Sequence, residues 1–250
     1  MIIILLGGVC INGYQNEIDF INYLNNKKFC ELNIMMQEFI INLFPKIKQN
    51  DIIDAYKYGR YAKADIIISV KGRKKGVSIK CGAKNSVHLE PIDKFILYLK
   101  KNRFKEINNL LNYLYSDGTN NNTGKNRISA SEYRIDHEEE IININSCLER
   151  IKLKLIFRFL IETDIKYKVC VDAFIYGYVS DFLWVTSDEV VKYLNNCSID
   201  SLGVHVSNLF IQNWNKNLIR NPKYEYCRNY IQVKWYSMFD DIIKIMCNRK

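Results

Sequence analysis

The most informative part of the chain is residues 64–82, which read Ala64-Asp65-Ile66-Ile67-Ile68-Ser69-Val70, Lys71-Gly72-Arg73-Lys74-Lys75-Gly76 and Val77-Ser78-Ile79-Lys80-Cys81-Gly82. Two β-branched runs around a basic turn predict two short strands joined as a hairpin. Side chains alternate faces along a strand, so Ser78 and Lys80 point the same way, with Asp65 near the same edge. A carboxylate, a second oxygen ligand and a lysine gathered there are groups that hold a divalent cation and activate water for phosphodiester hydrolysis.

This pattern resembles the core of the restriction-endonuclease-like superfamily, the PD-(D/E)xK nucleases. Members carry an Asp at the start of one strand, an acidic-x-Lys on the next, and often a Glu on the preceding helix. Asp65 matches the Asp and Lys80 matches the lysine, whereas Ala64 replaces the frequent Pro and Ser78 replaces the acid. The resemblance covers about residues 30–100 and rests on a short motif.

The predicted order of elements agrees with this resemblance. A helix over residues 31–44 and a strand over 52–58 precede the hairpin, and a helix over 91–101 follows it. Helix, three strands and helix is the order of the superfamily core. The alternative is an ordinary hairpin with a solvated turn.

The resemblance implies a role for each residue of the motif. Asp65 and a helix carboxylate would bind Mg²⁺ or Mn²⁺, and we expect Glu38 to be that carboxylate, with Glu31 as the alternative. Ser78 or the carbonyl of Ile79 would complete the metal shell. Lys80 would orient the attacking water and stabilise the developing negative charge.

The charge of the chain suits a polyanionic partner. The formal net charge is +9, and lysine and arginine displace counterions from phosphates, although a composition rich in Lys and Asn produces the same excess. We expect double-stranded DNA as the partner, and a homodimer is compatible with it. The candidate nucleic-acid contacts are Lys71, Arg73, Lys74, Lys84, Asn85, Ser86, His88, Lys216 and Arg220. His88 is equally well explained as an ordinary loop residue.

The 250 residues suggest one large domain or a core with an extension. We expect an α/β fold with a mixed sheet flanked by helices, in which residues 1–115 form the nuclease-like core and 125–250 a mixed extension packed on it. A polar loop over 116–125 separates the two. The sequence predicts a loop at residues 82–90. It predicts helices at 16–24, 104–115, 129–148, 151–161 and 187–194. It predicts strands at 169–178, 181–186, 204–212 and 230–235. The last of these contains Gln232-x-Lys234, a weaker competitor for the catalytic strand.

Cysteine spacing and hydropathy indicate a cytoplasmic protein. The eight cysteines include no CxxC pair and no cluster with zinc-finger spacing, which is typical of reduced thiols. The apolar run over residues 1–10 is too short to span a bilayer, so we expect a buried strand or cap there.

Three functions remain open from the sequence. The first is a metal-dependent endodeoxyribonuclease, of the restriction or mobile-element kind. The second is a DNA-binding protein with a decayed, non-catalytic nuclease core, which Ser78 favours because a hydroxyl is a weaker metal ligand than a carboxylate. The third is an accessory protein whose basic charge is a matter of composition alone.

Overall fold

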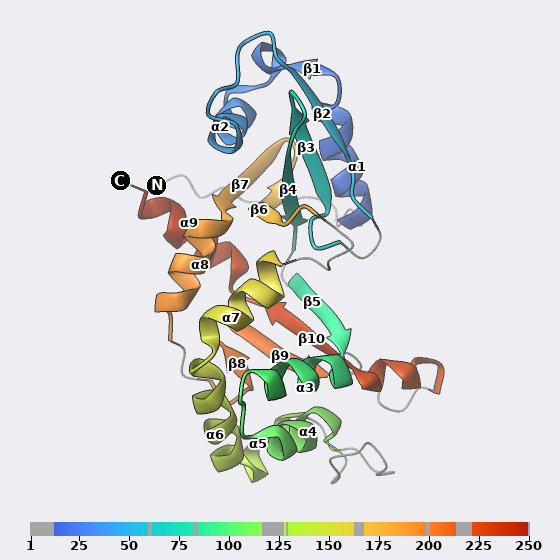
Figure 1. Ribbon diagram of the computed structural model, residues 1–250, viewed down its shortest axis with the longest axis vertical. Coiled ribbons are helices and arrows are strands. Elements are labelled where there is room, and N and C mark those ends of the chain that lie inside the picture. The colour runs from blue at the N-terminus through green and yellow to red at the C-terminus, as the bar shows by residue number, and fades with distance from the viewer. Residues whose placement is uncertain are drawn as a thin grey trace. The chain divides into compact units, whose positions relative to one another are not determined.

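The computed structural model describes residues 13–59, 62–82, 85–116, 128, 130–162, 168–198, 201–213 and 222–249. Contacts divide the chain into two compact units (Figure 1). Unit 1 comprises Met1–Ala83, Leu160–Tyr193 and Met238–Lys250, and unit 2 comprises Lys84–Phe159 and Leu194–Ser237. The units are therefore interleaved along the chain, whereas the sequence predicted consecutive parts at 1–115 and 125–250. Strand pairing between distant segments, described below, is the physical reason for this difference.

Unit 1 is built on a six-stranded mixed sheet with the strand order β1-β2-β3-β4-β6-β7. All neighbours are antiparallel except β4 and β6, which are parallel. The strands are β1 (Lys27–Lys28), β2 (Ile52–Lys57), β3 (Ile66–Val70), β4 (Arg73–Lys80), β6 (Val171–Tyr178) and β7 (Asp181–Thr186). The helices are α1 (Gly13–Leu24), the 3₁₀ helix η1 (Phe29–Glu31), α2 (Ile34–Leu43), α8 (Ser187–Asn196), which extends past Tyr193 into unit 2, and α9 (Met238–Cys247).

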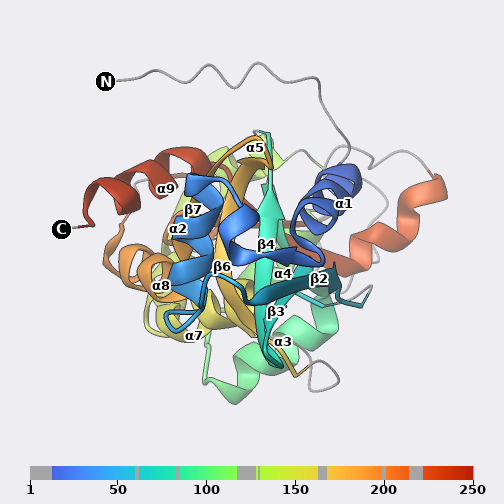
Figure 2. The ribbon, with the colours of Figure 1, turned by 90° about the horizontal axis from the view of Figure 1, so that it is seen from above.

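One face of the unit 1 sheet is covered by α1 and α2. Buried side chains from both helices and from five strands form one core, which includes Phe20, Leu24, Met36, Phe39, Ile53, Ile66, Val77, Ile175 and Phe182. Figure 2 shows α1 beside β2 and α2 beside β7. The rings of Phe20 and Phe39 each meet that of Phe182 edge to face, with centroids 5.5 and 6.0 Å apart. This shared core therefore fixes the position of α1 over β2.

The predicted hairpin is present as β3 and β4, with a shorter turn than expected. Only Lys71 and Gly72 form the turn, both with positive φ (51° and 77°), as two-residue hairpin turns require. Arg73 and Lys74, predicted as turn residues, pair with Val70 and Ser69 in the ladder. All of β3 is buried, which explains why four of its five residues are β-branched and apolar, with only Ser69 polar.

Unit 2 contains a four-stranded antiparallel sheet with the order β5-β10-β9-β8. The strands are β5 (Asn85–Pro91), β8 (His205–Val206), β9 (Leu209–Asn213) and β10 (Tyr230–Trp235). The helices are α3 (Ile92–Lys101), α4 (Ile107–Tyr115), α5 (Ala130–Asp136), α6 (Glu138–Glu149), α7 (Lys152–Ile156), the π-helix η2 (Phe157–Ile161), which runs on into unit 1, and the 3₁₀ helix η3 (Pro222–Asn229). Helix α3 contacts β5 and β10, α4 contacts β9, and α6 and α7 contact β8 (Figure 1).

Three sequence predictions for unit 2 are wrong. Residues 85–91 are strand β5 and no loop, because they pair with β10, far along the chain. Residues 204–212 are two short strands, since Ser207 adopts a positive φ of 51° and turns the chain. Residues 129–148 are two helices, which break at His137. Most of the predicted loop at 116–125 and the predicted strand or cap at 1–10 lie outside the described residues.

The predicted fold class is confirmed: the protein is α/β, with a mixed sheet flanked by helices. The predicted helix at 31–44 begins later, at Ile34, because the Asn33 side chain accepts a hydrogen bond from the Met36 N–H at 2.9 Å and caps it. Among the described residues, no helix combines the length and the apolar character needed to span a membrane.

Candidate functional site

Three groups converge on one oxygen at the edge of the unit 1 sheet. The Oδ2 atom of Asp65 accepts hydrogen bonds from the Ser78 hydroxyl at 3.0 Å, the Ile79 N–H at 2.7 Å and the Lys80 ammonium at 2.8 Å. Asp65 stands just before β3, where its own N–H donates to the carbonyl of Val77 at 2.9 Å. The hairpin register therefore brings the predicted Asp, Ser and Lys together.

A second acid–base pair lies beside the first. Glu17 of α1 forms an ion pair with Lys57, the last residue of β2, and the Lys57 ammonium also lies 4.6 Å from the centre of the Tyr14 ring. Helix α1 is anchored to the sheet by the buried Asn16, whose amide donates to the carbonyl of Gly177 at 2.9 Å. This anchor places Glu17 on the helix face that turns toward the sheet.

Electrostatics connects the two pairs. Burial is the main reason that the pKa of Lys57 lies below its ordinary value; nearby Lys80 lowers it further, while Asp65 opposes the shift. The charges of both Asp65 and Lys80 therefore influence the pKa of Lys57. We call Glu17, Lys57, Asp65 and Lys80 the Asp65 cluster, in which two carboxylates and two ammonium groups balance in charge.

The helix acids expected from the sequence lie elsewhere. Glu38 is on the exposed side of α2, and Glu31 belongs to η1, where its carboxylate accepts from the Lys28 N–H at 3.1 Å. Neither makes a contact with Asp65 within the part of the chain that the structure describes. Sequence reasoning missed Glu17, although a signal was present: Glu17, Phe20 and Leu24 are spaced as one helical stripe whose two apolar members enter the core.

The donor set of the Asp65 cluster suits a hard divalent cation. The described residues contain no group of three or more Asp, Glu, His or Cys side chains able to hold a metal ion. Mg²⁺ does not need one, since it is commonly bound by one or two carboxylates together with water and substrate phosphate. The Lys80 ammonium on Asp65 already shows that this carboxylate attracts a cation. Ile79 contacts Asp65 through its N–H, so the contact seen differs from the predicted carbonyl ligand.

The three basic residues of the hairpin end lie away from the Asp65 cluster. Lys71 is in the turn and forms an ion pair with Asp51 at 2.7 Å, and the Lys74 ammonium lies 5.9 Å from the centre of the Tyr56 ring. Arg73 begins β4 and is exposed. The whole length of β3 separates this end of the hairpin from Asp65, so these residues do not line the cluster.

The remaining candidates for phosphate contact belong to unit 2 or fall outside the described residues. Lys84, Lys216 and Arg220 fall outside them. Asn85, Ser86 and His88 are in β5, where Asn85 is buried. Gln232 and Lys234 are in β10, in a different sheet from Asp65, and Gln232 accepts a hydrogen bond from Gln212 at 3.3 Å.

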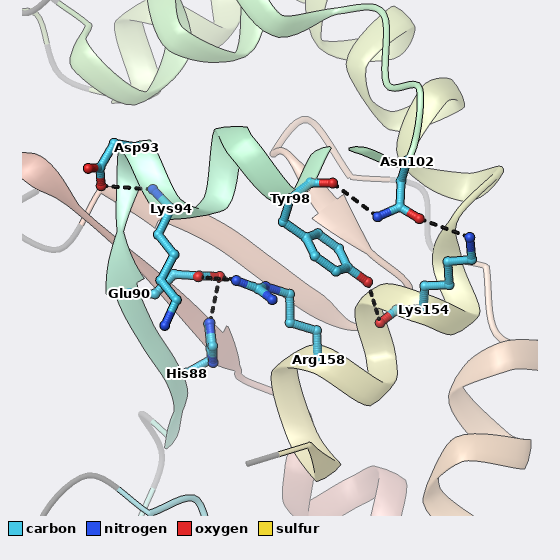
Figure 3. Close-up of polar contacts among 8 residues, drawn as sticks. All are labelled: His88, Glu90, Asp93, Lys94, Tyr98, Asn102, Lys154 and Arg158. Atoms are coloured by element: carbon cyan, nitrogen blue, oxygen red, sulfur yellow. Dashed lines mark hydrogen bonds and ion pairs between the residues drawn. The ribbon is translucent and has the colours of Figure 1, made fainter. Parts of the chain in front are cut away.

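His88 takes part in a buried ion cluster instead of an exposed loop (Figure 3). The Glu90 carboxylate contacts His88 Nε2 at 2.8 Å and accepts from the Arg158 Nε–H at 3.0 Å, while the Arg158 guanidinium stacks over the Tyr98 ring at 4.1 Å. Burial raises the pKa of Glu90, but the hydrogen bonds from His88 and Arg158 outweigh it, so the pKa lies below its ordinary value. This cluster ties β5 to the π-helix.

The sequence matches no protein-family model and no curated protein.

Proposed function

We propose that the protein is a metal-dependent phosphodiesterase that acts on DNA, an endodeoxyribonuclease with a restriction-endonuclease-like core in unit 1. The observation that carries this proposal is the convergence of Ser78, Ile79 and Lys80 on one carboxylate oxygen of Asp65. In chain order α1 and α2 both precede β2, β3 and β4, which supports it, because a helix before three strands is the order that the resemblance requires.

Each member of the Asp65 cluster has a defined task in this reaction. Asp65 and Glu17 are the carboxylates that would hold Mg²⁺, with the Ser78 hydroxyl beside Asp65. When bound, Mg²⁺ polarises the phosphodiester and lowers the pKa of a bound water. Lys80, half-buried beside Asp65, orients the water and stabilises negative charge that develops on the phosphate. Lys57 keeps Glu17 in place through its ion pair and adds a second positive charge for a polyanion.

Removal of the central pair is expected to abolish metal-dependent cleavage. Asp65→Asn and Lys80→Gln should each reduce the cleavage rate at least 100-fold, about the cost of one preorganised charged or hydrogen-bonding group in a catalytic site. The measurement is cleavage of plasmid and single-stranded DNA with Mg²⁺ or Mn²⁺, against EDTA.

The matched controls for these variants come from the same sheet. Lys75 and Asp172 form an ion pair at 2.7 Å, nearly the same length as the 2.8 Å pair of Lys80 and Asp65. Lys75→Gln and Asp172→Asn should cut at the wild-type rate. If variants of both ion pairs lost the same amount of cleavage rate, the catalytic assignment of Asp65 and Lys80 would be contradicted. Such a result would show that breaking any ion pair of this sheet disturbs the structure.

Glu17 and not Glu38 is expected to be the second acid. Glu17→Gln should lower the cleavage rate about tenfold or more and raise the Mg²⁺ concentration needed for half-maximal rate, because one of the two carboxylates is neutralised. Glu38→Gln is the control and should leave both quantities unchanged. A Mg²⁺ titration of the cleavage rate measures them, and a loss confined to Glu38→Gln would reverse the assignment.

Ser78 favours a second candidate, a DNA-binding protein without catalysis. The hydroxyl donates to Asp65 at the position where the resemblance expects a metal-binding acid. Salt-sensitive retention of duplex DNA by the wild type, without cutting in any metal, would select this candidate.

A further inference from the structure

The unit 2 sheet has two chemically different faces. Along β9 and β10 every second residue is buried, and the residues between them keep partial exposure. The buried face contains Leu209, Ile211, Ile231, Val233 and Trp235. The opposite face, which we call the outer sheet face, contains His205, Phe210, Gln212, Gln232 and Lys234, with Tyr236 next to it just past the end of β10.

Aromatic rings follow one another along the outer sheet face. The ring centroids of His205 and Phe210 are 5.9 Å apart, and those of Phe210 and Tyr236 are 5.5 Å apart. Tyr236 is 46% exposed, so one end of this row presents a ring to solvent. The exposed Tyr236 ring is suited to stack with a flat ligand, and the partly exposed Phe210 ring lies next to it.

Amide groups continue the row. The Tyr236 hydroxyl donates to the Gln212 side chain at 3.3 Å, and the Gln212 amide donates to Gln232 at 3.3 Å. These two side chains lie opposite each other on β9 and β10. Glutamine amides have both donors and acceptors, which match the edges of nucleobases.

Positive charge lies at the Tyr236 end of this face, while the acid Glu149 and the cation Lys152 both act on His205 at the other end. Lys234 follows Gln232 by two residues on β10, so both point to the same side. Burial raises the pKa of Tyr236 and the Arg134 guanidinium opposes that rise, which places a second positive charge near the ring. Among the described outer-face residues of β8, β9 and β10, none is acidic.

We propose that the outer sheet face binds single-stranded nucleic acid, with unpaired bases stacked on Tyr236 and Phe210. Such a strand combines flat rings, hydrogen-bonding edges and negative charge, which correspond to the aromatic, amide and cationic groups of this face. Duplex DNA keeps its base faces stacked inside the helix, so it cannot use the rings. The proposal concerns unit 2 alone and does not rest on the Asp65 cluster.

The test is the binding of a fluorescein-labelled oligothymidylate of about 16 nucleotides, followed by fluorescence anisotropy in EDTA. The full chain should bind it more tightly than a duplex of the same length. Tyr236→Ala should weaken binding about tenfold, as loss of one stacking ring does. Lys234→Gln should reduce the slope of log affinity against log salt by about 0.7.

Two control variants separate stacking from general damage. Tyr236→Phe keeps the ring and should retain most of the affinity, and Leu97→Ala removes an exposed side chain of α3 in the same unit and should change nothing. Equal binding by wild type and Tyr236→Ala, or preference for the duplex, would overturn the proposal. Because EDTA prevents metal-dependent cleavage, the result is independent of whether the Asp65 cluster cuts DNA.

Discussion

Gly76→Ala is expected to lower the free energy of unfolding by about 3 kcal/mol, the upper part of the range for overpacking a well-packed interior. A Cβ at position 76 would lie 2.1 Å from the carbonyl oxygen of Cys170 and 3.0 Å from the Ala64 Cβ. A backbone atom cannot rotate away as a side chain can, so β4 would have to separate from its neighbour. The Gly76 N–H also donates to the Asp172 carboxylate at 2.9 Å, and that hydrogen bond would be strained.

Chemical denaturation of the purified variants measures this effect. Gly72→Ala is the matched control, because Gly72 has a positive φ of 77° but a Cβ there would meet no other described part of the chain within 4 Å. This variant should lose only about 1 kcal/mol of unfolding free energy. If the proposed function holds, the Gly76 variant should also lose DNA cleavage, because Ala64 precedes Asp65 and a shift there separates Asp65 from Ser78. Equal losses of stability in the two variants would contradict the role of the close approach to Cys170.

Glu90→Ala is expected to lower the free energy of unfolding by about 4 kcal/mol, as the removal of one partner from a buried ion pair does. The side chains of Arg158 and His88 are only 17% and 11% exposed, and both contact the Glu90 carboxylate. Without it, the guanidinium would keep its charge in a poorly solvated place. Glu90→Gln should lose less unfolding free energy than Glu90→Ala, because the amide oxygen still accepts a hydrogen bond.

Two further measurements test this explanation. In the double variant Glu90→Leu with Arg158→Met, apolar groups replace both charges, so most of the stability should return. The pKa of Glu90 is lower in the folded protein than its ordinary value of 4.5. Its contribution is therefore complete above about pH 4.5 and is lost as pH falls through the folded pKa, so wild type and Glu90→Gln should converge in acid. If the double variant were as unstable as Glu90→Ala, the unpaired buried charge of Arg158 would not be the cause of the lost stability.

Residues close together in the sequence made the Asp65 hairpin predictable. Alternation along β4 places Ser78 and Lys80 on one side, and a two-residue turn fixes their register against β3. The contacts of Asp65 needed no information from elsewhere in the chain. The bounds of β3 and β4 differed from prediction by only a few residues for the same reason.

The position of Glu17 beside Lys57 was not predictable in this way. Glu38 and Glu17 are both on helices next to apolar residues, and local pattern does not say which helix crosses the ends of the strands. The answer depends on Asn16, which ties α1 to the carbonyl of Gly177, a residue distant in sequence. The same applies to β5, whose residues resemble a polar loop until β10 pairs with them.

Side-chain period, turn chemistry and helix caps act over a few residues, and they were sufficient for the α/β class, the hairpin and the contacts of Asp65. The interleaved units, the ion pair of Glu17 with Lys57, the burial of His88 with Glu90 and Arg158, and the two-faced sheet of unit 2 all depend on pairings between distant segments. Such pairings are selected by the packing of whole helices and strands against one another. The free energy of this packing depends on residues far apart in the chain, so it cannot be read from a short stretch of sequence.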